Sequence, residues 1–182
     1  MELESSNKNG IFTIHRDLDG EIANTEFQER EQYIGLVIGQ EEFLLAISTV
    51  REIVMLPPIT YVPNSPEYID GVINLRGTIL PAINMRKVMR MSRGTGEGST
   101  RIIIVRFEGL TFGLIVDGIT YVVALLPQEI ETQSLPGKGS GAEYISSVSK
   151  HGAKVTGILD LGRIVRAIAG DNITGENTET AA

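Results

Sequence analysis

An internal repeat constrains the fold of this chain more than any other feature. Residues 34–58 align without a gap on residues 103–127 at a shift of 69 positions. Further along, residues 79–85 align on residues 155–161 at a shift of 76, so the second copy contains a short insertion. A repeat of about 70 residues is longer than the units of solenoid proteins, which have roughly 20–50 residues. The sequence therefore predicts a small subdomain that is present twice.

Composition limits the class of protein. A chain of 182 residues forms one domain or two small ones and can bury a real core. It contains no cysteine, which excludes disulfides and thiolate chemistry and suits a reducing compartment. We find no signal-peptide pattern and no apolar run of the ~18 residues that a membrane span needs. These features predict a soluble, cytoplasmic protein without direct membrane insertion.

The net charge of −7 lies at the two ends of the chain. Residues 1–32 contain 8 acidic and 3 basic residues, and residues 170–182 contain 3 acidic residues and no basic one. The body between them is nearly neutral, with 12 acidic and 13 basic residues. Binding to nucleic acid needs clustered Lys and Arg, so we expect no nucleic-acid partner.

Three segments are predicted. Residues 1–31 are polar and acidic, which predicts a flexible extension with one short strand at Ile11–Ile14. Residues 32–169 form the folded domain, with repeats at about 33–91 and 101–169 that build two interleaved barrels. Residues 170–182 are predicted to be a flexible tail. A glycine-rich joint at Gly94, Gly96 and Gly98 separates the two copies.

Short strands dominate the pattern within each copy. Alternating apolar residues between turn signals predict about five strands per copy, which is enough to close a small barrel. Two short helices are predicted, Met85–Met91 after a cap at Asn84, and Leu161–Ala169 between a cap at Asp160 and a stop at Gly170. The predicted fold class is all-β, with two pseudo-repeated five-stranded barrels.

Three of the predicted strands are apolar on both faces. Residues 102–105, 114–116 and 122–126 show no alternation of apolar and polar side chains. In a barrel strand the outward face is usually polar, so the outer face here must be covered by the other barrel, a helix or a partner. We expect the other barrel to cover most of these residues and some apolar surface to remain exposed.

The chemistry of an enzyme is missing from the pattern. His15 and His151 have no ligand-spaced neighbours, which excludes a metal site and a convincing catalytic triad. The glycine-rich segment at residues 137–141 lacks the spacing of a phosphate-binding loop. Asp117, between a strand and Gly118, is expected to serve a turn. We predict no enzymatic activity, no metal and no cofactor.

Arg76 is the exception, because it is present in one copy only and Gly152 stands at its place in the other. An arginine among apolar neighbours either pairs with a carboxylate or presents its planar fork to a partner. Glu52 is the candidate carboxylate. The pattern leaves a structural Arg76–Glu52 pair and a binding role equally open. If dry and half-buried, such a pair would cost ~3–5 kcal/mol to break.

The segment Gly71-Val72-Ile73-Asn74-Leu75-Arg76-Gly77-Thr78-Ile79-Leu80-Pro81 is similar to the CheW family of chemotaxis coupling proteins. Residues 50–53 and 112–118 add to the resemblance, which covers roughly Tyr33 to Ala169. It implies two SH3-like five-stranded barrels around a shared apolar centre. It also implies a non-enzymatic adaptor in bacterial chemotaxis signal transduction, which joins the regulatory domain of the histidine kinase CheA to the cytoplasmic tips of methyl-accepting chemoreceptors.

The resemblance also implies where the partners bind. The kinase domain shares the double-barrel fold, so kinase and coupler can alternate in rings within membrane-associated arrays, and the coupler can self-associate there. Carried over by position, the receptor-facing groove involves five residues, namely Val50, Glu52, Arg76, Ile102 and Val122. The kinase-facing surface is assigned to Gly71, Asn74 and Ile79.

Two alternatives to an adaptor remain at this point. The chain could be a small-molecule or anion-binding double β-barrel with Arg76 as the anchor, which needs a pocket with convergent polar groups. It could also be a detached regulatory domain of a larger kinase, although it carries no ATP-binding or phosphotransfer motif. The adaptor predicts two protein partners, no turnover and apolar surface at the barrel junction.

Overall fold

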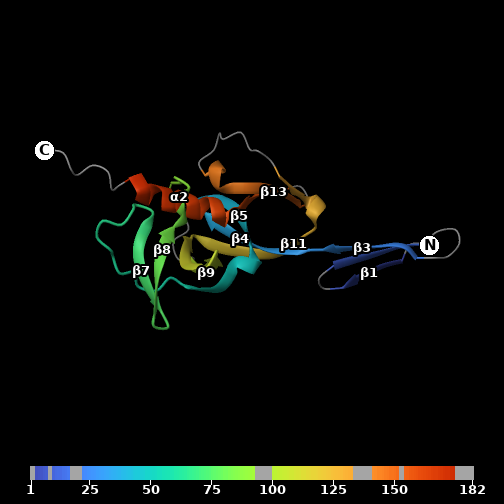
Figure 1. The fold of residues 1–182 in the computed structure, drawn as a ribbon, viewed down its shortest axis with the longest axis horizontal. Helices are drawn as coiled ribbons and strands as arrows, with labels where there is room; N and C mark the ends of the chain where they lie inside the picture. The colour runs from blue at the N-terminus through green and yellow to red at the C-terminus, as the bar shows by residue number, and fades with distance from the viewer. Residues whose placement is uncertain are drawn as a thin grey trace.

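The computed structural model describes residues 3–7, 10–16, 22–92, 100–132, 141–151 and 154–174. The glycine joint at residues 94–98 lies outside these ranges, as do most of the loop at 135–141 and the chain after residue 174. The described residues form one three-stranded sheet near the N-terminus and two larger sheets, and few of them are helical. The predicted all-β class is therefore confirmed (Figure 1).

The N-terminal sheet consists of three antiparallel strands, β1 (Leu3–Asn7), β2 (Gly10–Arg16) and β3 (Ile22–Glu29), in that order. The predicted strand at Ile11–Ile14 is confirmed as part of β2. Strands β1 and β3 are additions that the sequence did not predict, and the flexibility expected from the polar composition stays a prediction. Ladder hydrogen bonds join backbone groups, for example along the register Phe12↔Phe27, and composition does not reveal them. In Figure 1 this sheet extends to one side of the body.

The two larger sheets define two lobes. The first lobe is a five-stranded sheet made of β6 (Val50–Met55), β9 (Arg101–Phe107), β10 (Leu110–Val116), β8 (Thr78–Asn84) and β7 (Ile69–Leu75), in that spatial order. The second lobe is a six-stranded sheet made of β11 (Gly118–Leu125), β4 (Glu31–Ile38), β5 (Glu41–Ala46), β14 (Lys154–Leu159), β13 (Ile145–His151) and the two-residue β12 (Ile130–Glu131).

The two copies of the repeat exchange strands. The first lobe combines β6, β7 and β8 of the first copy with the hairpin β9–β10 of the second, and the second lobe has the reverse composition. The exchange is closed in each lobe by one parallel pairing, β10 with β8 and β14 with β5. Their registers, Gly113↔Ala82 and Ile158↔Leu44, are equivalent under the shifts of the repeat. The predicted pseudo-repeat is thus a pair of interleaved lobes.

In both lobes the chain beyond one edge strand pairs with the opposite edge strand. After β6, Thr60 forms an antiparallel bridge with Val72 of β7. After β11, the short strand β12 pairs with β13. These pairings link the two ends of each sheet, as expected for small barrels, and they cover strand edges that would otherwise be free. The second lobe therefore has one strand more than the five that the repeat predicts.

Three apolar clusters explain the strands that are apolar on both faces. In β9, Ile103 and Val105 enter a cluster that is shared by the two lobes, whereas Ile102 and Ile104 enter the interior of the first lobe. The interior of the second lobe contains a smaller cluster around Leu44. All four residues of β9 are at most 2% exposed. The prediction that the protein itself covers both faces is confirmed for this strand.

The helices follow their predicted caps but not their predicted ends. Asn84 accepts hydrogen bonds from the backbone N–H groups of Arg86 and Lys87 and begins α1 (Met85–Val88). The sequence places the end of this helix at Met91, but Arg90 adopts a left-handed conformation with φ +53°, which stops it early. The second helix, α2 (Leu161–Thr174), runs through Gly170 and therefore contradicts the predicted stop there.

Candidate docking surfaces

The hairpin of β7 and β8 carries Arg76 at its tip. Leu75 pairs with Thr78, so Arg76 and Gly77 form a two-residue turn, and both have positive φ, +51° and +88°. This is the turn type that fits the twist of a β-hairpin. The Gly77 N–H donates to Asn74 Oδ1 at 2.8 Å, which braces the turn. The hairpin therefore presents the Arg76 side chain, of which 80% is exposed, to solvent.

Arg76 forms the predicted pair with Glu52. Arg76 Nη2 donates to Glu52 Oε2 at 3.0 Å, and this contact joins the hairpin tip to the edge strand β6. The pair is exposed, which differs from the half-buried and dry arrangement considered from sequence. An exposed pair of this kind contributes ~0–1 kcal/mol. Its main effect is to orient the guanidinium above β6.

Strand β6 presents Arg51, Ile53 and Met55 to solvent. Its residues alternate between partly buried and exposed along its length. Ile53 and Met55 are exposed, the latter by 76%, although both are large apolar residues. Val50 and Glu52 point the other way and are partly buried, and Val50 packs against the shared core. Val50 and Glu52 are therefore only partly accessible to a partner.

The other two residues of the predicted receptor-facing groove have opposite environments. Val122 of β11 is 57% exposed beside the exposed Tyr121, and it lies in the second lobe. Ile102 is 0% exposed and lies inside the first lobe, against Gly113 of the neighbouring strand. Its side chain packs in the interior of the first lobe, so its burial lends the assignment to a contact surface no support, and the assignment stays a prediction carried over from the family resemblance.

The predicted kinase-facing residues divide in the same way. Asn74 and Ile79 form a cross-strand pair on the β7–β8 hairpin, and both are exposed, Ile79 by 59%. Gly71 is buried with φ +144°, and a Cβ there would lie 2.2 Å from the Thr60 carbonyl oxygen. Glycine is required at this position because the chain after β6 approaches β7 so closely. Gly71 thus shapes the barrel, and its burial lends no support to its assignment to the kinase-facing surface, which stays a prediction.

The exposed apolar residues are related by the repeat. Ile53 of β6 corresponds to Val122 of β11 at a shift of 69, and Ile79 of β8 corresponds to Val155 of β14 at a shift of 76. All four are exposed by 38–62%. Each lobe therefore presents an apolar residue at equivalent positions. The sequence analysis missed Ile53 and Val155, although the alignment of the copies contains the signal that would have found them.

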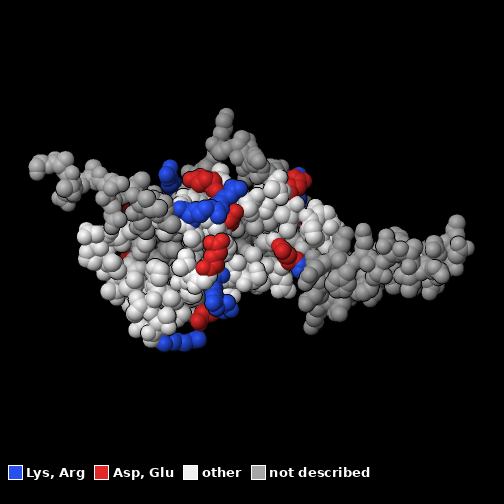
Figure 2. Space-filling view, in the orientation of Figure 1, with Lys and Arg blue, Asp and Glu red and all other residues white. Residues whose placement is uncertain are grey.

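Charged side chains gather elsewhere on the molecule. On the face drawn in Figure 2, acidic and basic residues alternate in a central band, and the areas on either side carry few charges. Arg86 and Asp117 form an ion pair in which the Asp117 side chain is buried. Asp117, 6% exposed, accepts from Arg86 Nε at 2.6 Å and also pairs with Arg86 Nη2. It also accepts from the Gly39 N–H at 2.6 Å, so it supports a turn as predicted.

Other kinds of site find no support in the described part of the chain. There, no three acidic, histidine or cysteine side chains come together as metal ligands. His15 lies in β2 and His151 in β13, which belong to different sheets. None of the described helices has the length and apolar character needed to cross a bilayer.

Comparison with known proteins agrees with this geometry. A profile of the CheW-like domain matches residues 32–169. The chain is 29% identical to a chemotaxis protein CheW of Treponema pallidum over 140 residues, which cover 75% of this chain and 82% of the relative. It is 27% identical to a chemotaxis protein CheW of Klebsiella aerogenes, with 86% of this chain and 90% of the relative covered.

A solved structure shares the fold. The scaffolding protein TtCheW of Thermoanaerobacter tengcongensis superimposes with a TM-score of 0.67 and 30% sequence identity. The superposition covers 72% of this chain and 89% of that protein.

Proposed function

This chain belongs to the CheW-like domain family, and we propose that it is an adaptor that couples the cytoplasmic tips of chemoreceptors to the regulatory domain of the histidine kinase CheA. Proteins of this family are scaffolding and coupling proteins of chemotaxis rather than enzymes. The observation that carries the proposal is that each lobe exposes two apolar residues at equivalent positions, Ile53 and Ile79 on the first lobe, and Val122 and Val155 on the second. An adaptor needs more than one contact surface, and exposed apolar residues on both lobes can provide them.

The receptor tip would contact the surface around Arg76, Glu52, Val50 and Val122. A helical hairpin can place apolar side chains against Val122, while the oriented Arg76 guanidinium pairs with a carboxylate on its rim. The exposure of Arg76 supports this role, since its side chain is accessible to a partner and its exposed pair with Glu52 contributes little to stability.

The kinase domain would contact the exposed Asn74–Ile79 pair of the first lobe. The family resemblance gives the kinase domain the same double-barrel fold, so the two proteins would meet barrel to barrel and alternate in rings. The equivalent residue Val155 would give the second lobe a related contact, which also allows this protein to self-associate in such rings. The protein would then lie in the cytoplasm, recruited to membrane-associated receptor arrays.

Binding of an anion at Arg76, the other function considered from sequence, finds less support. Arg76 already pairs with Glu52, and it lies at an exposed hairpin tip where a ligand would remain in water. Pockets that bind small ligands bury most of the ligand surface and combine an apolar lining with a few polar groups. The tip of a hairpin does not offer this environment.

Pairwise binding tests the proposal. We expect the protein to bind a purified CheA regulatory domain and a receptor-tip fragment, each in calorimetry. Ile79→Lys is expected to weaken kinase binding at least tenfold and to leave receptor binding unchanged, whereas Val122→Lys has the reverse effect, because a lysine replaces an apolar contact. Leu110→Lys, which lies on the exposed start of β10 outside the proposed contacts, is the matched control for a lysine on an exposed strand. Failure of the unmodified protein to bind either partner would contradict the proposal.

A further inference from the structure

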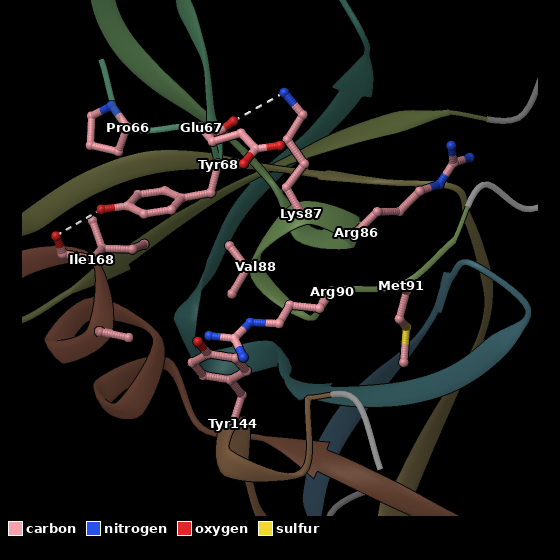
Figure 3. A pocket seen from close by; sticks show the side chains of 11 residues that line it. Pro66, Glu67, Tyr68, Arg86, Lys87, Val88, Arg90, Met91, Tyr144 and Ile168 are labelled. Atoms are coloured by element: carbon pink, nitrogen blue, oxygen red, sulfur yellow. Dashed lines mark hydrogen bonds between the residues drawn. The ribbon is translucent and has the colours of Figure 1, made fainter. Parts of the chain in front are cut away.

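A pocket of about 590 Å³ opens where α1, α2 and the segment before β7 meet. Its volume is in the range of small-molecule sites. None of the residues assigned to receptor or kinase contacts lines it. Figure 3 shows its side chains, which come from Pro66, Glu67, Tyr68, Arg86, Lys87, Val88, Arg90, Met91, Tyr144, Ala167 and Ile168.

Both copies of the repeat contribute a tyrosine to this pocket. Tyr68 and Tyr144 are related by the shift of 76, and each follows a glutamate. Their backbone carbonyls accept equivalent hydrogen bonds, from the Asn84 N–H and the Asp160 N–H, both at 2.8 Å. The Tyr68 hydroxyl donates to the Ile168 carbonyl oxygen of α2 at 2.9 Å, which holds the ring in place. The pocket therefore has two aromatic walls that the fold positions on both sides.

Three cations line the pocket, and two of them have carboxylate partners. Arg86 pairs with the buried Asp117, and Lys87 Nζ lies 2.9 Å from Asp70 Oδ1 and donates to the Glu67 carbonyl oxygen at 3.0 Å. Arg90 makes no ion pair with any carboxylate of the described residues. Its side chain extends across the pocket toward Tyr144, on the wall opposite Glu67 and Lys87 (Figure 3).

The backbone at Arg90 is unusual for this residue type. Its φ of +53° lies in the left-handed region two residues after the end of α1, where glycine is the usual residue when a helix ends in this conformation. A residue other than glycine is strained there. Strain of this kind is typical of positions where the side chain serves a function. Here the strained residue directs into the pocket a guanidinium that forms no ion pair with the described carboxylates.

We propose that this pocket binds a small organic anion, with Arg90 pairing with its carboxylate or phosphate group and the two tyrosines holding its apolar body. The guanidinium fork matches the geometry of both groups. Tyr68 and Tyr144 provide flat walls, and Val88 and Ile168 add apolar contacts between them. The site is separate from the protein-docking surfaces, so the proposal does not depend on the identity of the protein partners.

Titration of the full chain with benzoate and phenyl phosphate tests the proposal, with calorimetry for affinity and tyrosine ring signals in NMR for location. We expect both anions to bind in a saturable way and to shift the signals of Tyr68 and Tyr144. Benzamide, which has no charge, and inorganic phosphate, which has no apolar body, are expected to bind at least roughly tenfold more weakly.

Arg90→Gly is the informative variant, because glycine suits the left-handed backbone and the protein should keep its fold. It is expected to lower the affinity for both anions by roughly tenfold or more. Two control variants should bind the anions like the unmodified protein. Arg166→Gln removes an exposed cation of α2 outside the pocket lining, and Arg76→Gln removes the exposed cation of the β7–β8 hairpin. The proposal is wrong if neither anion saturates at millimolar concentration, if Arg90→Gly binds them equally well, or if Arg76→Gln abolishes binding.

Discussion

Tyr33 shows how a single side chain connects burial, charge and stability. It is 5% exposed in the interior cluster of the second lobe. Its hydroxyl donates to Glu31 Oε2 at 2.5 Å. Burial, and then the neighbouring Glu31 carboxylate, raise the pKa of Tyr33 well above its ordinary value. The folded protein therefore keeps this proton at a pH where the unfolded chain releases it.

The stability of the protein is accordingly expected to fall as the pH rises above about 10, the ordinary pKa of tyrosine. Because the folded-state pKa is raised, the contribution of Tyr33 is complete below that pH and is lost above it, by at most about 1.4 kcal/mol per pH unit. Urea unfolding at a series of pH values checks this. Tyr33→Phe should show a shallower decline, and an unchanged decline in this variant would rule out Tyr33 as its source.

At this scale the sequence predicted some residues well and others poorly. The Arg76–Glu52 pair could be predicted because both residues are charged among apolar neighbours. The burial of Ile102 and Gly71 could not be predicted, since it depends on contacts between separate segments of the chain. Ile102, for instance, lies in the interior cluster of the first lobe with Ile73 of β7 and Leu80 of β8.

At the scale of single elements, hairpins were the most predictable part of the fold. Alternation of apolar residues on both sides of a turn identifies hairpins such as β4–β5 from local sequence alone. The early end of α1 was missed because it depends on the left-handed backbone of an arginine, which sequence patterns do not indicate. The two-residue strand β12 was missed because pairing with β13, rather than its own composition, makes it a strand.

The β7–β8 hairpin gives a prediction for an element. Because Arg76 and Glu52 are exposed, a double-mutant cycle with Arg76→Ala and Glu52→Ala should give a coupling free energy below about 1 kcal/mol that declines with salt. Urea unfolding measures it. The strain of alanine at φ +51° occurs in both variants that lack Arg76 and cancels from the cycle. A coupling of about 3 kcal/mol or more would mean a buried pair, contrary to the structure.

The whole molecule is defined by the exchange of strands between the two copies. The repeat predicted two related subdomains, and the resemblance to a known family implied their barrel fold. The parallel pairings that complete the exchange join segments far apart in sequence, and no local pattern specifies them. Each lobe therefore depends on both copies for its core.

Cutting the chain within residues 93–99 tests this dependence. Each half alone lacks the partner strands for its exchanged hairpin, so neither should form a monomer with a cooperative unfolding transition. Mixed in equal amounts, the halves should assemble and regain the circular dichroism spectrum of the intact protein. A cooperative, monomeric transition in one isolated half would contradict the interleaved architecture.

The central claim is that this protein connects two partners at separate surfaces. The most direct test is sedimentation of the intact protein with a CheA regulatory domain and a receptor-tip fragment together. The account predicts a ternary complex that Val122→Lys reduces to the kinase complex and Ile79→Lys to the receptor complex. Competition between the two partners for the protein, with no ternary species at any concentration, would contradict it.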